Sequence, residues 1–203
     1  MHIEYELKYF SNVDSAYKIL KQNAQLVHPR TLMKRVYLQD TFVPDRWIRI
    51  RDEGSCVKVT FKKNNHQGKI DSVSEIEMQV FNFEHAQDFF LALGYVSRMY
   101  VETYRETWSY ENTMITLDTW PGIPQFLEIE GNDAQDVYRA AFALGYSQES
   151  ENDMHKNKDG IVAHMKEVYC KFWNISLEQF KTITYLTFEN VETIKRNLEK
   201  NLE

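Results

Sequence analysis

The sequence predicts an α+β fold: a closed eight-stranded antiparallel β-barrel with helices packed outside it and a helical C-terminal tail. Runs of alternating apolar and charged residues recur through residues 1–131, and a period of two is typical of strands. Turn signals such as Pro121-Gly122 separate these runs. Beyond them the apolar residues take helical spacing. We therefore expect a single domain over residues 1–203, with the barrel strands within 1–131 and a helical region over 132–203.

The chain starts with a predicted strand and a predicted helix. Ile3, Tyr5 and Leu7 alternate with charged residues, which indicates a strand with one apolar face. Residues 12–26 follow with apolar residues at helical spacing, and Asn12 is a candidate N-cap.

The remaining elements follow from the same two periodicities. Further strand-like runs lie near 33–41, 46–52, 56–63, 73–81, 97–108, 112–119 and 124–130. Helices are predicted over 83–93, 133–144, 161–172, 176–186 and 190–202, with a polar loop over 147–160. With the first strand this makes eight strands, the number at which a sheet can close around side chains or one ligand.

Composition and charge exclude several classes of protein. Hydrophobic residues make up 43% of the chain, which is enough for a core, and the formal net charge is −6. Nucleic-acid binders usually carry a basic excess, so we expect no nucleic-acid partner. Only two cysteines occur, which indicates a reducing compartment. No signal-peptide core and no apolar run of membrane-spanning length is present, so we expect a cytoplasmic protein that does not bind membranes.

Charged residues recur two positions apart on almost every predicted strand. The sets are Glu4-x-Glu6-x-Lys8, Arg49-x-Arg51, Lys58-x-Thr60-x-Lys62, Glu75-x-Glu77 and Glu128-x-Glu130. Residues two apart on a strand project from one face, where charges of the same sign repel each other. A barrel interior in which acids share a cation and bases share an anion would explain this pattern. The solvated face of an open sheet is the alternative, and spacing alone leaves both open.

These residues resemble the CYTH family, the triphosphate tunnel metalloenzymes, which includes class IV adenylyl cyclases, thiamine triphosphatases and inorganic triphosphatases. The resemblance starts at Glu4-Tyr5-Glu6-Leu7-Lys8, the family's Glu-x-Glu-x-Lys hallmark. It continues in order through Tyr37-Leu38-Gln39-Asp40-Thr41, Ile48-Arg49-Ile50-Arg51, Val59-Thr60-Phe61-Lys62, Glu75-Ile76-Glu77, Arg105-Glu106-Thr107-Trp108, Leu117-Asp118-Thr119 and Phe126-Leu127-Glu128-Ile129-Glu130-Gly131. A lone Glu-x-Glu-x-Lys is a weak signal, whereas further blocks in order are a strong one.

The resemblance implies a barrel tunnel that binds Mg²⁺ or Mn²⁺ and cradles a triphosphate. The implied metal ligands are Glu4, Glu6, Asp118, Glu128 and Glu130. The implied triphosphate-binding residues are Lys8, Arg49, Arg51, Lys58, Lys62 and Arg105, of which Lys8, Lys62 and Arg105 are the candidate catalytic residues. Lys58 either binds phosphate or flanks the tunnel mouth. Glu75 and Glu77 either bind metal or brace the arginines, and we favour bracing.

One departure from the family pattern concerns Thr103-Tyr104-Arg105, where many members carry Lys-x-Arg. Catalysis is therefore less firmly implied than binding. We favour a triphosphatase that acts on a small organic or inorganic triphosphate. A class IV adenylyl cyclase and a non-catalytic triphosphate- or polyphosphate-binding module are the alternatives. For the helical tail, docking on the barrel, a lid and a homodimer contact are all open.

Overall fold

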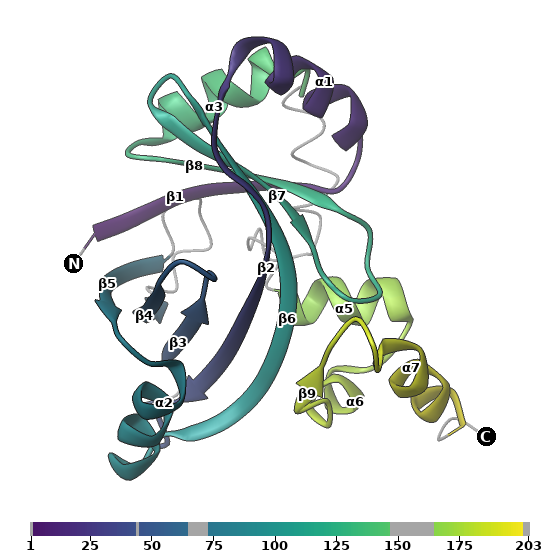
Figure 1. Cartoon of the computed structure of the whole chain (residues 1–203). Helices are drawn as coiled ribbons and strands as arrows, with labels where there is room; N and C mark the ends of the chain where they lie inside the picture. Colours follow the sequence, from purple (N-terminus) through teal and green to yellow (C-terminus); the bar gives the residue numbers. More distant parts are fainter. Residues whose placement is uncertain (1, 44, 65–72, 147–164, 201–203) are drawn as a thin grey trace.

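The computed structural model of the protein describes residues 2–43, 45–64, 73–146 and 165–200 (Figure 1). In this part of the chain a large, strongly curled sheet has helices packed around it. The predicted α+β class with an antiparallel sheet is confirmed. None of the helices described here is long and apolar enough to cross a membrane. The predicted loop over 147–160 lies outside the described residues.

The sheet contains all eight predicted strands and one further, very short strand. They are β1 (His2–Tyr9), β2 (Gln25–Gln39), β3 (Arg46–Asp52), β4 (Val57–Asn64), β5 (Val73–Val80), β6 (Val96–Tyr110), β7 (Thr113–Thr119), β8 (Phe126–Gly131) and β9 (Tyr185–Leu186). Their order in the sheet is β2-β3-β4-β5-β1-β8-β7-β6-β9, and β2 additionally pairs with β6. In the sheet order, β2 and β6 are the first and the last of the eight longer strands. Their pairing places them side by side, as the two long curved ribbons of Figure 1 show.

The helices are α1 (Val13–Asn23), α2 (Phe83–Ala92), α3 (Ala134–Ala143), α5 (Met165–Trp173), α6 (Leu177–Lys181) and α7 (Val191–Lys200). Side-chain caps explain where two of them begin. Asn82 accepts a hydrogen bond from the backbone N–H of His85 at α2, and Asp133 accepts one from that of Asp136 at α3. Asn12 is the N-cap of α1 as predicted, but it has a left-handed φ of 55° and makes no side-chain cap bond.

Strand β2 begins earlier than the sequence predicts. The helical spacing extends α1 to residue 26, yet α1 ends at Asn23 and Gln25 already pairs with Ser109 of β6. The first residues of β2 are exposed and do not alternate, so periodicity gives no sign of a strand. Pairing with a strand that lies far away in the sequence decides their conformation.

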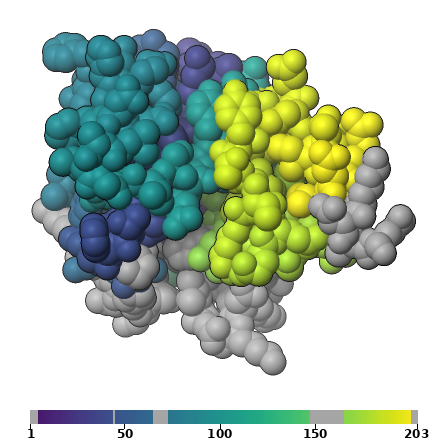
Figure 2. Space-filling view, turned by 90° about the horizontal axis from the view of Figure 1, so that it is seen from below, coloured from purple at the N-terminus to yellow at the C-terminus, as the bar shows by residue number. Residues whose placement is uncertain are grey.

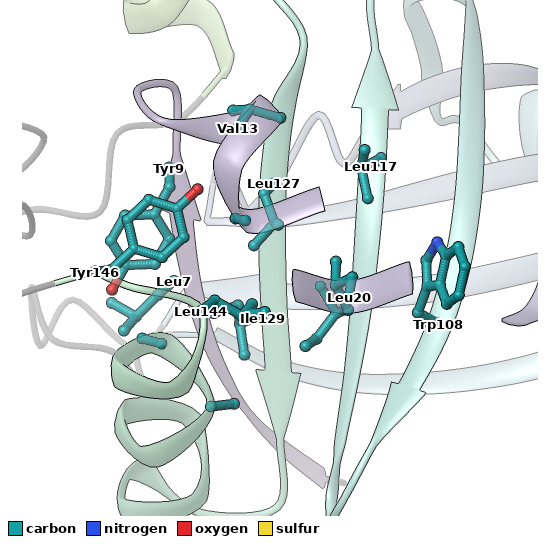
Figure 3. Close-up of a cluster of buried hydrophobic side chains, with 14 of the residues drawn as sticks. Leu7, Tyr9, Val13, Leu20, Trp108, Leu117, Leu127, Ile129, Leu144 and Tyr146 are labelled. Atoms are coloured by element: carbon teal, nitrogen blue, oxygen red, sulfur yellow. The ribbon is translucent and has the colours of Figure 1, made fainter. Parts of the chain in front are cut away.

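Three apolar clusters place the helices on the sheet. In the first, Leu7, Leu127 and Ile129 from β1 and β8 pack against α1 and α3, and the rings of Tyr9 and Tyr146 stack 3.9 Å apart (Figure 3). A second cluster joins β2, β3 and β4 to Phe83 of α2. Because these faces are apolar and covered by helices, the charged positions between them point to the other side of the sheet.

The third cluster joins residues 165–200 to β6, to β8 and to the turn between β7 and β8, and Figure 2 shows residues 165–200 as one block on one side of the molecule. The helix predicted over 176–186 is largely wrong. The capping box of Ser176 and Gln179 starts α6, which ends at Lys181. The chain then becomes extended, because the backbone N–H of Tyr100 donates to Thr184 O at 2.8 Å and β9 pairs with β6.

Candidate functional site

The charged faces of the strands surround a cavity of about 970 Å³. Most of the charged residues singled out from the sequence line it: Glu6, Lys8, Arg49, Arg51, Lys58, Lys62, Glu75, Glu77, Arg105, Glu128 and Glu130. They come from β1, β3, β4, β5, β6 and β8, because the two-residue period of each strand turns alternate side chains to the same side. These side chains therefore face one common cavity.

Asp118 is placed differently from the prediction, whereas for Glu4 the structure describes the backbone alone. Asp118 is fully buried behind the cavity wall and contacts arginines. Glu4 lies on β1 opposite Val73 of β5, and its side chain lies outside the described part of the structure.

Arginines crowd one side of the cavity. Arg49 and Arg51 project from β3, and Arg51 lies directly opposite Arg35 of β2 in the strand ladder. Burial and the neighbouring charges of Arg49, Arg105 and Arg35 lower the pKa of Arg51 to about 9. The charged form of this guanidinium is thus disfavoured by its surroundings, and a bound anion would relieve the repulsion.

Carboxylates brace several of these bases. Glu53, from the turn between β3 and β4, forms ion pairs with Arg51 and, at 3.6 Å, with Lys58. Glu77 Oε1 lies 3.1 Å from Lys58 Nζ, and its Oε2 accepts a hydrogen bond from Thr60 at 3.0 Å. Burial raises the pKa of Glu77, but the contacts with Lys58 and Thr60 and the charge of Arg51 together outweigh burial, and the net shift is downward.

The partners of Glu77 and Glu75 match the bracing interpretation. Glu77 Oε2 also lies 3.8 Å from Arg49 Nη2. Glu75 Oε2 lies 3.0 Å from Lys62 Nζ. Both acids therefore hold a base of the cavity wall in place. The sequence left two roles for Lys58, phosphate binding and flanking the tunnel mouth. Lys58 lines the cavity and forms ion pairs with Glu53 and Glu77.

The opposite wall, formed by β1 and β8, is richer in acids. Glu6 lies directly opposite Glu130 in the ladder, and Lys8 lies opposite Glu128. Lys8 forms ion pairs with Glu6 and, at 2.8 Å, with Glu128. Burial opposes ionisation of Glu128, yet the charges of Lys8 and Arg105 outweigh burial and hold its pKa well below the usual range.

Arg105 joins the acidic wall to the buried centre of the site. Its Nη2 lies 2.5 Å from Glu128 Oε2 and 2.8 Å from Asp118 Oδ2, and its Nε donates to Asp118 Oδ1 at 3.0 Å. Burial alone would lower its pKa, but Asp118 and Glu128 raise it. Arg105 is therefore a fixed cation, held by two carboxylates at the cavity wall.

Arg35 is a site residue that the sequence analysis misses. It lines the cavity, is only 2% exposed, and its Nη2 lies 3.4 Å from Asp118 Oδ1. Its Cζ lies 5.1 Å from the centre of the Trp120 ring. Burial, followed by the charge of Arg105, lowers its pKa. The only signal in the sequence is its position: on a strand it shares a face with Tyr37 of the Tyr37-Leu38-Gln39 block.

Thr103, which replaces a lysine of the family pattern, is fully buried on β6. It lies two residues before Arg105 and therefore on the same face of the strand. Its hydroxyl has no hydrogen-bond partner in the described part of the chain. It does not line the cavity as described.

The donor set fits a hard divalent cation. Glu6, Glu128 and Glu130 offer carboxylate oxygens on adjacent strands, and such oxygens suit Mg²⁺ or Mn²⁺. Like charges directly opposite each other, as Glu6 and Glu130 are, destabilise a ladder unless a cation lies between them. In the described residues no three metal-ligating side chains are gathered, and Glu6 and Glu128 are instead paired with bases.

The protein is thus a curled, largely antiparallel sheet whose cations and carboxylates face one cavity. The CYTH domain family matches residues 2–151, which is more than half of the sequence, and the chain belongs to this family. All the candidate metal- and triphosphate-binding residues lie inside the matched range, whereas α5, α6, β9 and α7 lie outside it. A comparison with curated proteins found no match.

Solved structures share the fold at low sequence identity. A protein from Pyrococcus horikoshii OT3 is 20% identical with a TM-score of 0.64, over 73% of this chain and 93% of that chain. A candidate adenylate cyclase from Vibrio parahaemolyticus is 16% identical with a TM-score of 0.61, over 73% and 92%. A candidate adenylyl cyclase from Hippeastrum with a dominant triphosphatase activity is 14% identical with a TM-score of 0.51, over 74% and 88%.

Proposed function

We propose that this CYTH protein is a divalent-metal-dependent triphosphatase, in which strands β1 to β8 form a closed tunnel around a small triphosphate. One observation carries the proposal: the bases of five strands converge on one cavity of about 970 Å³. These bases include Lys8, Arg35, Arg49, Arg51, Lys58, Lys62 and Arg105. The pairing of β2 with β6 supports the closed tunnel.

A triphosphate fits the distribution of charge. Its oxygens are spread along a chain, so they can contact Arg49 and Arg51 on β3 and Lys62 on β4 at the same time. The crowding that lowers the pKa of Arg51 is a cost in the free protein. An anion with several charges removes that cost for several cations at once, which a monophosphate does less well.

The acidic wall is the proposed metal site, with Glu6, Glu128 and Glu130 as the residues that would hold Mg²⁺ or Mn²⁺. Glu4 belongs to the same proposed set. When bound, the metal ion neutralises charge on the phosphate oxygens. Asp118 contributes indirectly, because its two oxygens hold Arg35 and Arg105 rather than face the cavity.

Positioning and charge neutralisation account for most of the catalysis of phosphoryl transfer. Lys8 and Arg105 both contact Glu128, so their charges lie where the basic and acidic parts of the cavity meet. They are the proposed groups that stabilise charge on the leaving phosphate. Lys62 is a mobile point charge braced by Glu75, and it is proposed to hold the phosphate that water attacks.

An adenylyl cyclase is the second candidate, because the similar Vibrio structure is described as a candidate adenylate cyclase. The two reactions use the same charges and differ in the nucleophile. Water gives hydrolysis, whereas the ribose 3′-hydroxyl of ATP attacking its α-phosphate gives cyclic AMP and pyrophosphate.

A product assay tests the proposal. The purified protein is incubated with ATP, thiamine triphosphate and inorganic triphosphate, each with Mg²⁺ and with Mn²⁺. Release of inorganic phosphate supports the triphosphatase, and cyclic AMP with pyrophosphate supports the cyclase instead. Binding of a triphosphate without any product would show a non-catalytic binding module and overturn the proposal.

A further inference from the structure

The second half of strand β5 lies at an open edge of the sheet. Residues 2–4 of β1 pair with residues 73–75 of β5, and the pairing between these two strands ends there. Over residues 76–80 of β5, the described part of the chain places β4 on one side and no strand on the other. The backbone N–H and C=O groups that point away from β4 are therefore available for pairing with another strand.

This half of β5 is exposed on both faces, whereas a strand of a folded sheet normally buries at least one. Ile76 and Met78 point to the outer face and are each 55% exposed. Phe81, which follows the strand directly, is fully exposed. The other face carries Glu77 and Gln79, which are exposed as well. Apolar side chains gathered on an unpaired strand are typical of an interaction surface.

Helix α2 covers the strands next to β5 but not β5 itself. Its Phe83 packs with Ile48 and Ile50 of β3 and with Val59 of β4, and all of these side chains are buried. Val59 lies directly opposite Met78 in the ladder, so the cover ends between these two residues. Figure 1 shows β5 on the left of the molecule, with α2 below it. The apolar outer face thus continues from the core under α2 onto β5, where it is exposed.

The order of residues on β5 suits a second copy of the same strand. The sequence Ile76-Glu77-Met78-Gln79-Val80 alternates apolar and polar residues symmetrically about Met78. An antiparallel pair with a two-fold axis at Met78 places Met78 beside Met78 and Ile76 beside Val80, all on the outer face. On the other face Glu77 lies opposite Gln79 of the second copy, so no like charges meet. An axis at Glu77 would instead bring the two Glu77 carboxylates together, which is unfavourable.

We propose that the protein forms a two-fold symmetric dimer in which β5 of one copy pairs with β5 of the other, antiparallel and centred on Met78. The two sheets then continue into each other through main-chain hydrogen bonds between the open edges. A specific interface buries about 1,200–2,000 Å² in total, so side chains beyond the strand take part as well. Phe81 is the exposed side chain placed to do so, because it follows β5 directly.

The dimer would also extend the cavity wall at Glu77 and Lys58. The side chains of these two residues are 31% and 32% exposed, whereas those of Arg49, Lys62 and Arg105 are 13% exposed or less. In the proposed register Gln79 of the second copy lies beside Glu77 and covers this more open part of the wall. The dimer itself does not depend on the proposed function, because it uses only the edge and the outer face of the sheet.

Sedimentation velocity of the full chain over a range of protein concentrations tests the dimer. We expect the wild type to sediment as a dimer that dissociates on dilution. Met78→Lys places two lysines side by side at the axis and should raise the Kd of the dimer by about tenfold or more. The matched control is Phe142→Lys on α3, because Phe142 is also 55% exposed. Its dimer Kd should stay within about twofold of wild type.

Two substitutions of Gln79 test the register. Gln79→Glu places an acid opposite Glu77 at two symmetric positions and should raise the dimer Kd by about two- to thirtyfold. Gln79→Lys places a base at the same positions and should lower the dimer Kd by a similar factor. Opposite effects at one exposed residue exclude a folding defect, and melting temperatures measured at low protein concentration check this directly.

Amide hydrogen exchange locates the interface. Residues 76–80 should become protected as the protein concentration is raised. A wild type that stays monomeric overturns the proposal and leaves the edge to a strand of another protein. A dimer with an unchanged Kd in Met78→Lys overturns it too, and so does protection of residues 76–80 in the monomer, where another segment of the chain would cover the edge. The triphosphate product assay is read separately, so failure of the dimer leaves the proposed function standing.

Discussion

Arg35 and Arg51 lie directly opposite each other on β2 and β3, and both guanidinium groups are buried. Each is held by a carboxylate from elsewhere in the fold, Arg35 by Asp118 and Arg51 by Glu53. Two cations in this arrangement repel each other, and the pKa values of both are lowered. The fold thus maintains a concentration of positive charge that these carboxylates offset in part and that an anion in the cavity would relieve further.

Substitution Arg51→Ala should weaken triphosphate binding without unfolding the protein. It removes one charge-assisted phosphate contact and also relieves cation crowding. Such a contact contributes about 1.5–3 kcal/mol, or roughly a ten- to hundredfold change in Kd. Calorimetry with inorganic triphosphate measures the loss, and raised Mg²⁺ should not restore binding, because the defect lies in the phosphate cradle.

Arg46→Ala is the matched control for Arg51→Ala. Arg46 begins the same strand, but it lies 3.3 Å from Asp40 and is not part of the cavity lining. Its loss should leave the Kd for triphosphate within about twofold of wild type, because this half-buried ion pair lies outside the cavity lining. Equal losses in the two variants would contradict the assignment of Arg51 to the cradle.

Substitution Glu130→Gln should lower turnover in a way that added metal partly reverses. Glu130 lies opposite Glu6, and the change removes one negative charge from the proposed metal site while keeping the side chain's shape. Metal affinity falls, so the rate at fixed triphosphate should recover as Mg²⁺ or Mn²⁺ is raised. Glu111→Gln, an exposed carboxylate on the turn after β6, serves as the control and should follow the wild-type metal titration. A metal-independent defect in Glu130→Gln would argue against a metal site on this wall.

Removal of divalent metal should abolish turnover but leave the fold intact. The apolar clusters under α1, α2 and α3 hold the sheet without any metal ligand. Treatment with a chelator is therefore expected to stop product release, while circular dichroism keeps the native spectrum and the melting temperature falls by only a few degrees. Complete unfolding on chelation would show instead that the metal is structural.

How far the sequence predicted the site depends on the residue. Arg49 and Arg51 are predictable because they occur as a same-sign pair on one strand face, which few solvated strands show. Arg35 stands between Met33 and Tyr37 on its face, so no pattern marks it. Its place beside Arg51 and Asp118 follows from the register of β2 with β3 and from a contact across 83 positions of the sequence. The spacing of residues along the chain carries no information on strand register or on such long-range contacts.

The same distinction applies to the fold. Strands with alternating residues, such as β3 and β4, were predicted within one or two residues, because one face is buried and the other is charged. The start of β2 and strand β9 were missed, since both depend on pairing with β6. The contribution of Met165 and Phe180 to the cavity could not be predicted either, because it depends on where the C-terminal segment docks.

The last prediction concerns acid stability and Glu128. Its pKa in the folded protein lies well below the usual range because Lys8 and Arg105 outweigh burial. In the unfolded chain a glutamate titrates near about 4.3. The unfolded state therefore binds more protons in this window, so stability falls as pH drops below about 4.5 through the folded pKa.

Urea denaturation at pH 7, 4.5 and 3.5 measures this effect. The wild-type midpoint should fall steeply between pH 4.5 and 3.5. Glu128→Gln should have a lower midpoint at pH 7, because Lys8 and Arg105 lose a partner, and a shallower fall in acid, because the titrating group is gone. Glu111→Gln keeps the contacts of Glu128 with Lys8 and Arg105. It should follow the wild type, since the carboxylate it removes is exposed. Parallel curves for Glu128→Gln and wild type would mean that Lys8 and Arg105 do not hold Glu128 ionised.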